Sequence, residues 1–346
     1  MKRNVKLIVT LSSLALLLCA CRGGRGRNSE SSISLPWISG STTVSPTTGS
    51  NPTTAGTTDA SGTSGQSVTT ASGTSATGGT SVTSQTSVTS VTSTVTPTTS
   101  ITPTSLPDDV NQYYSGISDS LSGTDLLNAL NSLNSSKKKK NVTYNGMKTF
   151  AAKCDIDPDG SGKIIGFYDN AKIGPAWDSA ATWNREHVWP DCRGGNLVEG
   201  DAHMPRPASV SVNSDRGSKG FGTESYDPGQ YVAYYRGVCA RIIFYCAIAN
   251  KSLKLIEDPI NYSGGSPSDS MGCLSDMLRW NLQYLPSDTS FTGGNDLARR
   301  VELNRNEVIQ KDSDGQGNRN PFIDHPEYAC RIWGNTNSTT RSVCGM

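Results

Sequence analysis

Histidine is scarce in this chain, which has 3 histidines in 346 residues. Aromatic residues make up only 7%, and neither sign of charge dominates, because 31 Lys and Arg face 30 Asp and Glu. Proteins that bind nucleic acid through a broad basic surface are usually strongly basic, so the charge balance argues against that mode of binding. The apolar run from Leu7 to Leu18 is too short to span a bilayer well.

The N-terminus instead has the layout of a signal peptide. Lys2, Arg3 and Lys6 precede the apolar run. Residues 18–21, Leu-Cys-Ala-Cys, look like a bacterial lipobox, so we predict a lipoprotein signal peptide over residues 1–20 and lipidation of Cys21. The alternative is an ordinary secretory signal with a cysteine there by chance. The first interpretation places the protein at the cell surface, held to the bacterial membrane by a lipid anchor.

The next segment, residues 21–107, is dominated by Ser, Thr, Gly and Pro. Such a composition buries too little apolar surface to offset the entropy of ordering, so we predict a disordered tether. Residues 108–346 are long enough for one domain with a real core. They hold 25 Lys and Arg against 28 Asp and Glu, a net charge of about −3. If this domain binds nucleic acid, the positive charge that attracts the phosphates must be concentrated near the site, because the domain as a whole is slightly negative.

The domain has seven cysteines, and an exported protein can form disulfide bonds. Seven is odd, so at least one thiol is free, and the sequence does not give the connectivity. Cys239 and Cys246 lie about 10 Å apart along the axis if their segment is helical, which is too far for a bond. No pair has the spacing of a zinc ribbon, so structural thiols and disulfides are favoured over a metal cluster.

The hydrophobic pattern predicts a mixed α+β domain. Helices are expected at 121–133, 236–250, 275–282 and 296–311, and a strand at 163–168. Residues 183–216 are rich in Pro, Gly and Asn and are expected to form loops and short strands that end in a helix.

That last region carries the candidate chemistry. Trp183-Asn184-Arg185-Glu186-His187-Val188-Trp189-Pro190 sets a carboxylate beside an imidazole, and Asn213 follows downstream. Hydrolysis of a phosphodiester needs a base for water and a cation for the phosphate charge. His187 suits the first task, and the oxygens of Glu186 and Asn213 suit a magnesium ion, which tolerates a sparse, open site. On an extended strand Glu186 and His187 point to opposite faces, so they share a site only if the backbone bends or the metal and the water lie on different sides of the phosphate. A purely structural turn is the alternative.

Other polar residues have less specific patterns. Arg216 lies one helical turn after Asn213, so it either reaches a phosphate or pairs with an acid. Arg185 is expected to be structural, His203 to pair with Asp201 and support the site, and His325 to sit in a capped turn. The acidic loop at 155–160 lacks the glutamate that completes a calcium-binding loop.

The octapeptide resembles the signature of the bacterial endonuclease I family, secreted or periplasmic non-specific nucleases with a ββα-metal (His-Me finger) site. Further segments resemble the family in the same order along the chain. They are Tyr113-Tyr114, Asp201-x-His203 with Arg206-Pro207 and Val212-Asn213-x-x-Arg216, Arg236-Gly237-x-x-Ala240-Arg241, and 316–327. One departure is Met204-Pro205, which stands where many members carry an Asn-Leu or His-Leu pair.

The resemblance implies a single α+β domain with a ββα-metal site. It implies His187 as general base, and Glu186 and Asn213 as ligands of one magnesium or calcium ion. The implied reaction is hydrolysis of DNA, and RNA is a further implied substrate. Cleavage is expected to show little sequence preference and to leave a 5′-phosphate. No protein partner is implied, and a monomer is expected. Two rivals remain at this point: a catalytically silent surface-binding lipoprotein that keeps the fold, and a phosphatase for small esters.

Overall fold

The structure is a computed structural model that describes residues 106–263 and 269–346. The predicted signal peptide, Cys21 and nearly all of the predicted tether lie outside these residues. In the described ranges, no helix combines the length and apolar character needed to cross a bilayer.

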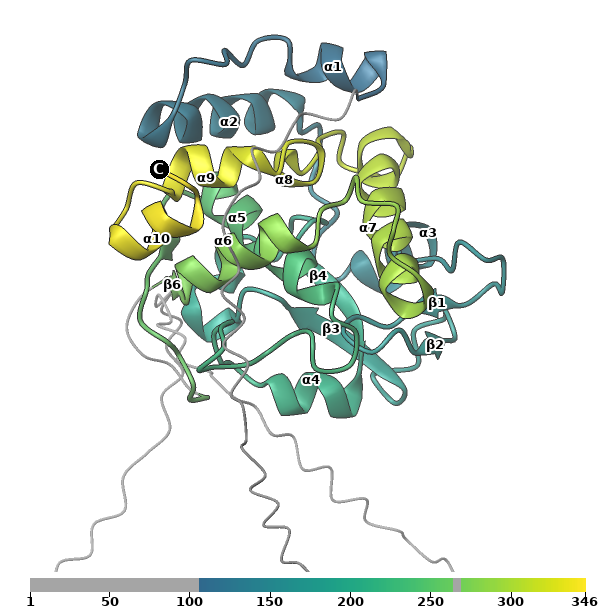
Figure 1. The fold of residues 1–346 in the computed structure, drawn as a ribbon. Helices are drawn as coiled ribbons and strands as arrows, with labels where there is room; N and C mark the ends of the chain where they lie inside the picture. Colours follow the sequence, from purple (N-terminus) through teal and green to yellow (C-terminus); the bar gives the residue numbers. More distant parts are fainter. Residues whose placement is uncertain (1–105, 264–268) are drawn as a thin grey trace, which may run out of the picture. The chain divides into compact units, whose positions relative to one another are not determined.

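Helices dominate the described part, and three two-stranded sheets accompany them (Figure 1). The α-helices are α1 (Asp108–Tyr114), α2 (Gly123–Lys137), α3 (Met147–Cys154), α4 (Val210–Arg216), α5 (Tyr235–Ala249), α6 (Leu274–Gln283), α7 (Gly293–Lys311), α8 (Pro321–Asp324), α9 (Glu327–Trp333) and α10 (Ser338–Val343). The strands are β1 (Ile164–Ile165), β2 (Lys172–Ile173), β3 (Trp183–His187), β4 (Pro205–Ser209), β5 (Lys254–Leu255) and β6 (Ser270–Met271). Short 3-10 turns, η1 (Asp191–Arg193) and η2 (Gly195–Leu197), follow β3.

Helix α5 forms the centre of the core. All but two of its residues are buried, which is typical of a helix that is apolar on every side. Helices α2, α6, α7 and α8 pack against it. Its one fully buried charge, Arg241, is neutralised by both oxygens of Glu302 from α7 at 2.7 Å. The helix predicted at 236–250 is thereby confirmed.

Strands β3 and β4 form an antiparallel pair, and α4 begins directly after β4. The register sets Glu186 opposite Arg206 and His187 opposite Pro205. Helix α4 packs against both strands. Figure 1 shows α4 at the opposite end of the described part from α1 and α2, with β3 and β4 between them. The predicted mixed α+β class with a ββα unit is confirmed.

The strand predicted at 163–168 is wrong in its second half. Only Ile164 and Ile165 pair with β2, and the chain then turns back at once, with the Asn170 N–H donating to the Gly166 carbonyl. Tyr168 takes a φ of +79°, a left-handed conformation that is uncommon for non-glycine residues. The turn carries the Tyr168 ring into the core, where it is fully buried.

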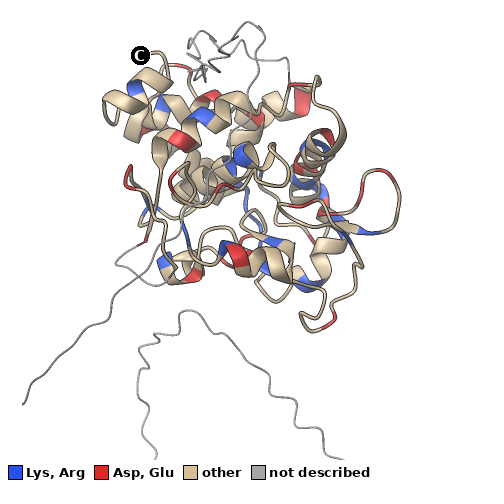
Figure 2. Cartoon of the chain, turned by 60° about the horizontal axis from the view of Figure 1, so that its bottom comes forward, with Lys and Arg blue, Asp and Glu red and all other residues tan. Residues whose placement is uncertain are grey.

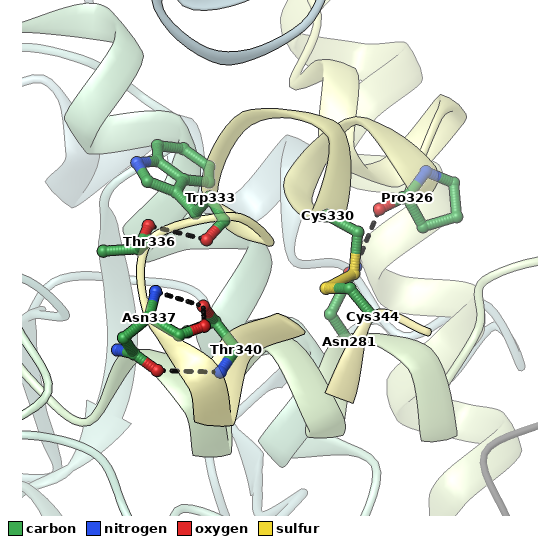
Figure 3. The surroundings of a disulfide bond; sticks show 8 residues. All are labelled: Asn281, Pro326, Cys330, Trp333, Thr336, Asn337, Thr340 and Cys344. Atoms are coloured by element: carbon green, nitrogen blue, oxygen red, sulfur yellow. Dashed lines mark hydrogen bonds between the residues drawn. A yellow bond between two sulfur atoms is a disulfide. The ribbon is translucent and has the colours of Figure 1, made fainter. Parts of the chain in front are cut away.

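A disulfide bond joins Cys330 in α9 to Cys344 at the end of α10 (Figure 3). By chain-entropy arguments, closing a loop of this size contributes about 3 kcal/mol. The other five described cysteines are free, and Cys239 and Cys246 are both buried in α5. The predicted disulfide bonding, the free thiol and the exclusion of a bond between Cys239 and Cys246 are confirmed.

Candidate active site

Glu186 and His187 are neighbours on β3 whose side chains have different surroundings. The Glu186 carboxylate is 2% exposed and accepts a hydrogen bond from the Tyr168 hydroxyl at 2.8 Å. The His187 ring packs on the Tyr144 ring, with centroids 4.4 Å apart. Strand alternation explains this division, because successive side chains leave a strand on opposite faces. The backbone of β3 therefore does not bring the two side chains onto one face.

Burial makes Glu186 responsive to a cation. Burial raises the pKa of the Glu186 carboxyl to about 7, although Arg216 and the Tyr168 hydroxyl lower it. Without a cation, the group is thus only partly ionised near neutral pH. A bound divalent cation favours the ionised carboxylate, so metal binding and loss of the Glu186 proton are coupled.

Asn213 on α4 lies beside the same face of β3 as Glu186. Its side-chain nitrogen donates to the Asn184 amide oxygen at 2.6 Å, and Asn184 precedes Glu186 by two residues. Among the described residues, no hydrogen bond involves Asn213 Oδ1 or Glu186 Oε2. One open amide oxygen and one open carboxylate oxygen on adjacent elements fit magnesium or calcium, which prefer oxygen ligands.

The His187 imidazole is suited to accept a proton. Burial lowers its pKa to about 4, with Asp191 opposing the shift and Arg185 and Arg216 adding to it. The ring is therefore neutral at neutral pH, as a general base requires. Its Nε2 atom lies 3.4 Å from Glu199 Oε2.

His187 also belongs to a second group of possible metal ligands. One ligand atom each from His187, Asp191 and Glu199 lie within 4.8 Å of one another. An ion held there would use the imidazole as a ligand and remove it as a base. Sequence reasoning singled out neither Asp191 nor Glu199, since exposed or half-exposed acids carry no local signature.

Arg216 is buried beneath the end of β3. It donates to the Val188 carbonyl at 2.7 Å and the His187 carbonyl at 3.3 Å, and its Nε atom lies 3.4 Å from Glu186 Oε1. Of the two roles that the sequence left open, the pair with an acid is present. Phosphate contact stays a prediction, and the side chain is only 1% exposed.

His203 and His325 contact neither the Glu186 carboxylate nor the His187 ring. The His203 ring lies 3.3 Å from the Asn318 carbonyl and packs on Tyr245, while its backbone N–H donates to Asp201. The His325 ring is 2.9 Å from the Glu327 carboxylate. Arg185 bonds to the Tyr144 carbonyl at 2.6 Å.

Burial of His203 predicts a pH effect on stability. Burial lowers the pKa of His203 to about 3, against about 6.5 in an unfolded chain. The contribution of the neutral His203 imidazole to the free energy of unfolding is fully present above pH 6.5. It is lost as the pH falls from 6.5 toward 3. Urea unfolding should therefore show the stability advantage of wild type over His203→Gln shrinking by about 2 kcal/mol between pH 7 and 5. Glu186 titrates in both proteins, so its effect cancels in the stability difference between them. A constant difference would contradict a buried neutral imidazole.

Comparison with known proteins identifies relatives across this region. The sequence model of the endonuclease I family matches residues 122–233, which contain β3, β4 and α4. The chain is 34% identical over 245 residues to an extracellular ribonuclease of Bacillus amyloliquefaciens and 32% identical over 245 residues to one of Bacillus subtilis strain 168. Each alignment covers 65% of this chain and 79% of the relative. No solved structure matches the chain.

Proposed function

The chain belongs to the endonuclease I family, and we propose on this basis that it is an extracellular nuclease using one divalent cation and His187. The proposed substrates are DNA and RNA, cleaved without sequence preference to leave a 5′-phosphate. RNA gains support from the names of both relatives, which are extracellular ribonucleases. The observation that carries the proposal is the adjacent pair Glu186 and His187 on a strand packed against the helix that supplies Asn213, whose side-chain nitrogen donates to Asn184 and leaves its oxygen open.

His187 acts as the base in this proposal. Its lowered pKa keeps the imidazole unprotonated at neutral pH, so it can take a proton from the attacking water. Tyr144 restricts the ring by packing against it at a tilt, and the Tyr144 hydroxyl donates to the Arg185 carbonyl at 3.0 Å. The base is thus held on a rigid strand rather than on a mobile loop.

Glu186 and Asn213 are proposed to hold a magnesium or calcium ion. When bound, the ion supplies positive charge to the phosphate oxygens and a Lewis acid for the leaving oxygen. Tyr168 and Arg216 position the carboxylate through Oε1. Asn184 orients the Asn213 amide so that its oxygen stays available. Arg216 therefore has a positioning role beside its predicted phosphate contact.

The direct test is a substrate panel of RNA, single-stranded DNA and duplex DNA of mixed sequence. We expect cleavage throughout each strand and products with 5′-phosphate ends, read by end labelling before and after phosphatase treatment. Binding without cleavage of any member would support the rival, a silent surface-binding lipoprotein. Release of phosphate from small esters alone would support a phosphatase.

Anchoring at the cell surface is proposed from Cys21. Replacing Cys21 with serine should release the protein from the membrane fraction, because no other lipid attachment site is predicted. Specific activity should remain that of wild type, since the predicted tether, rich in Ser, Thr, Gly and Pro, is expected to transmit no strain to the domain. Fractionation and activity assays on both fractions measure the two effects. Membrane retention of the Cys21→Ser protein would point to a different anchor.

A further inference from the structure

A row of aromatic rings and cations extends from His187 over the surface. The His187 ring packs on Tyr144, and the Arg185 guanidinium lies 3.6 Å from the Tyr144 ring centroid. Arg185 also lies 5.2 Å from the Trp177 ring, and the Lys148 ammonium lies 5.1 Å from that ring. We call Tyr144, Lys148, Trp177 and Arg185 the aromatic–cation row. Its contacts are continuous with the proposed general base.

The aromatic–cation row is partly exposed to solvent and packs against a buried residue. All four of its residues are half-buried. Trp177 packs edge-on against the buried Trp183, with ring centroids 4.9 Å apart. Because Trp183, Arg185 and His187 alternate along β3, they lie on one strand face. The indole of Trp177 is therefore fixed in place while part of its surface stays accessible.

Charges of both signs lie near His187, and the cations of the row have no acidic partner among the described residues. In the described part of the chain, neither Lys148 nor Arg185 forms an ion pair with a carboxylate, whereas Lys153 binds two aspartates. Two acids also lie close to the ring, because His187 Nε2 is 3.4 Å from Glu199 Oε2 and Asp191 belongs to the same group. Basic and acidic segments are interspersed over the described part of the chain (Figure 2). A polyanion that reaches His187 is thus attracted along the row and repelled from the two acids.

We propose that the aromatic–cation row binds unpaired nucleotides next to the scissile phosphate, so that the enzyme prefers single strands to duplexes. An unpaired base stacks on Trp177, and its phosphates lie against Lys148 and Arg185. This inference rests on the proposed nuclease function. Its physical basis is that aromatic side chains stack on free bases, whereas duplex bases are already stacked on one another.

The test compares binding of two fluorescent probes of mixed sequence, a single-stranded oligonucleotide and a hairpin duplex. His187→Ala serves as a non-cleaving background, with calcium present. Adding Trp177→Leu keeps an apolar side chain over Trp183 but removes the π face. We expect about ten-fold weaker binding of the single strand and little change for the hairpin. Tyr231→Ala, which removes an aromatic that is 53% exposed, is the matched control and should change neither.

Kinetics and salt dependence give independent readouts. In the active enzyme, Trp177→Leu should raise KM for single strands by a similar factor and leave kcat unchanged. Lys148→Gln should weaken both probes and reduce the slope of log affinity against log salt by about one, as the loss of one phosphate contact requires. Lys148 is at the surface, so this variant remains informative if Trp177→Leu does not fold.

Several outcomes would overturn the inference. Equal losses for both probes with Trp177→Leu would mean that the row does not distinguish single strands. Unchanged binding of both probes by folded Trp177→Leu and Lys148→Gln proteins would assign the row a purely structural role. If the wild-type enzyme cleaves nucleic acid and the variants give either of these results, the inference fails but the nuclease proposal stands. A wild-type protein that cleaves no nucleic acid refutes the nuclease proposal instead, so the two failures are distinguishable.

Discussion

Replacing His187 with alanine is expected to lower the turnover of nucleic acid by about a hundred- to ten-thousand-fold, the usual effect of losing a general base. Divalent-ion affinity should stay near that of wild type, because Glu186 and Asn213 are the proposed ligands. Single-turnover cleavage and titration calorimetry with magnesium measure the two effects. His325→Ala is the matched control, since this histidine contacts neither the Glu186 carboxylate nor the His187 ring.

Two results would contradict this expectation. Near-normal turnover in a folded His187→Ala protein would remove His187 from the mechanism. A parallel loss of metal affinity would instead favour the group formed by His187, Asp191 and Glu199 as the metal site.

Replacing Glu186 with alanine is expected to weaken magnesium binding by about ten- to a hundred-fold or more, an estimate scaled from the effect of losing an outer-shell partner. Asn213→Ala should act in the same direction with a smaller effect, because a neutral amide contributes less than a carboxylate. Activity should recover in part at high magnesium, since the ion keeps waters in place of a lost ligand. Calorimetry and activity against magnesium concentration provide the measurements.

Asp191→Asn and Glu199→Gln are the matched controls for these two variants. They remove carboxylates from the second group of possible ligands and leave Glu186 and Asn213 in place. We expect their magnesium affinity to equal that of wild type. If the controls lose affinity while Glu186→Ala and Asn213→Ala keep it, the ion is held on the other side of β3.

Sequence patterns predicted the parts of the fold that depend on local periodicity. The apolar run of α5 identifies a buried helix whatever surrounds it. The segment at 163–168 shows the limit, because its apolar pattern also suits a two-residue strand followed by a tight turn at Tyr168. The pairing of Cys330 with Cys344 depends on how α9 and α10 meet, which residue spacing does not record.

The residues of the candidate site likewise fall into those that the sequence predicted and those that it did not. Glu186, His187 and Asn213 stand out because they lie in a short motif with a chemical rationale. Tyr168 reaches Glu186 across 18 residues, and Tyr144 bonds the Arg185 carbonyl across 41 residues. These contacts arise from tertiary packing, and a lone tyrosine in a sequence carries no sign of its partner.

Plasmid nicking with and without a chelator tests the central claim, a divalent-ion-dependent nuclease, most directly. Supercoiled DNA is incubated with the protein in magnesium, then with excess chelator, then with magnesium restored. We predict nicking in the first and third conditions and none in the second, with His187→Ala slower than wild type by about a hundred- to ten-thousand-fold wherever magnesium is present. Nicking that continues undiminished in chelator would contradict the claim, and nicking by His187→Ala at the wild-type rate would remove His187 from the mechanism.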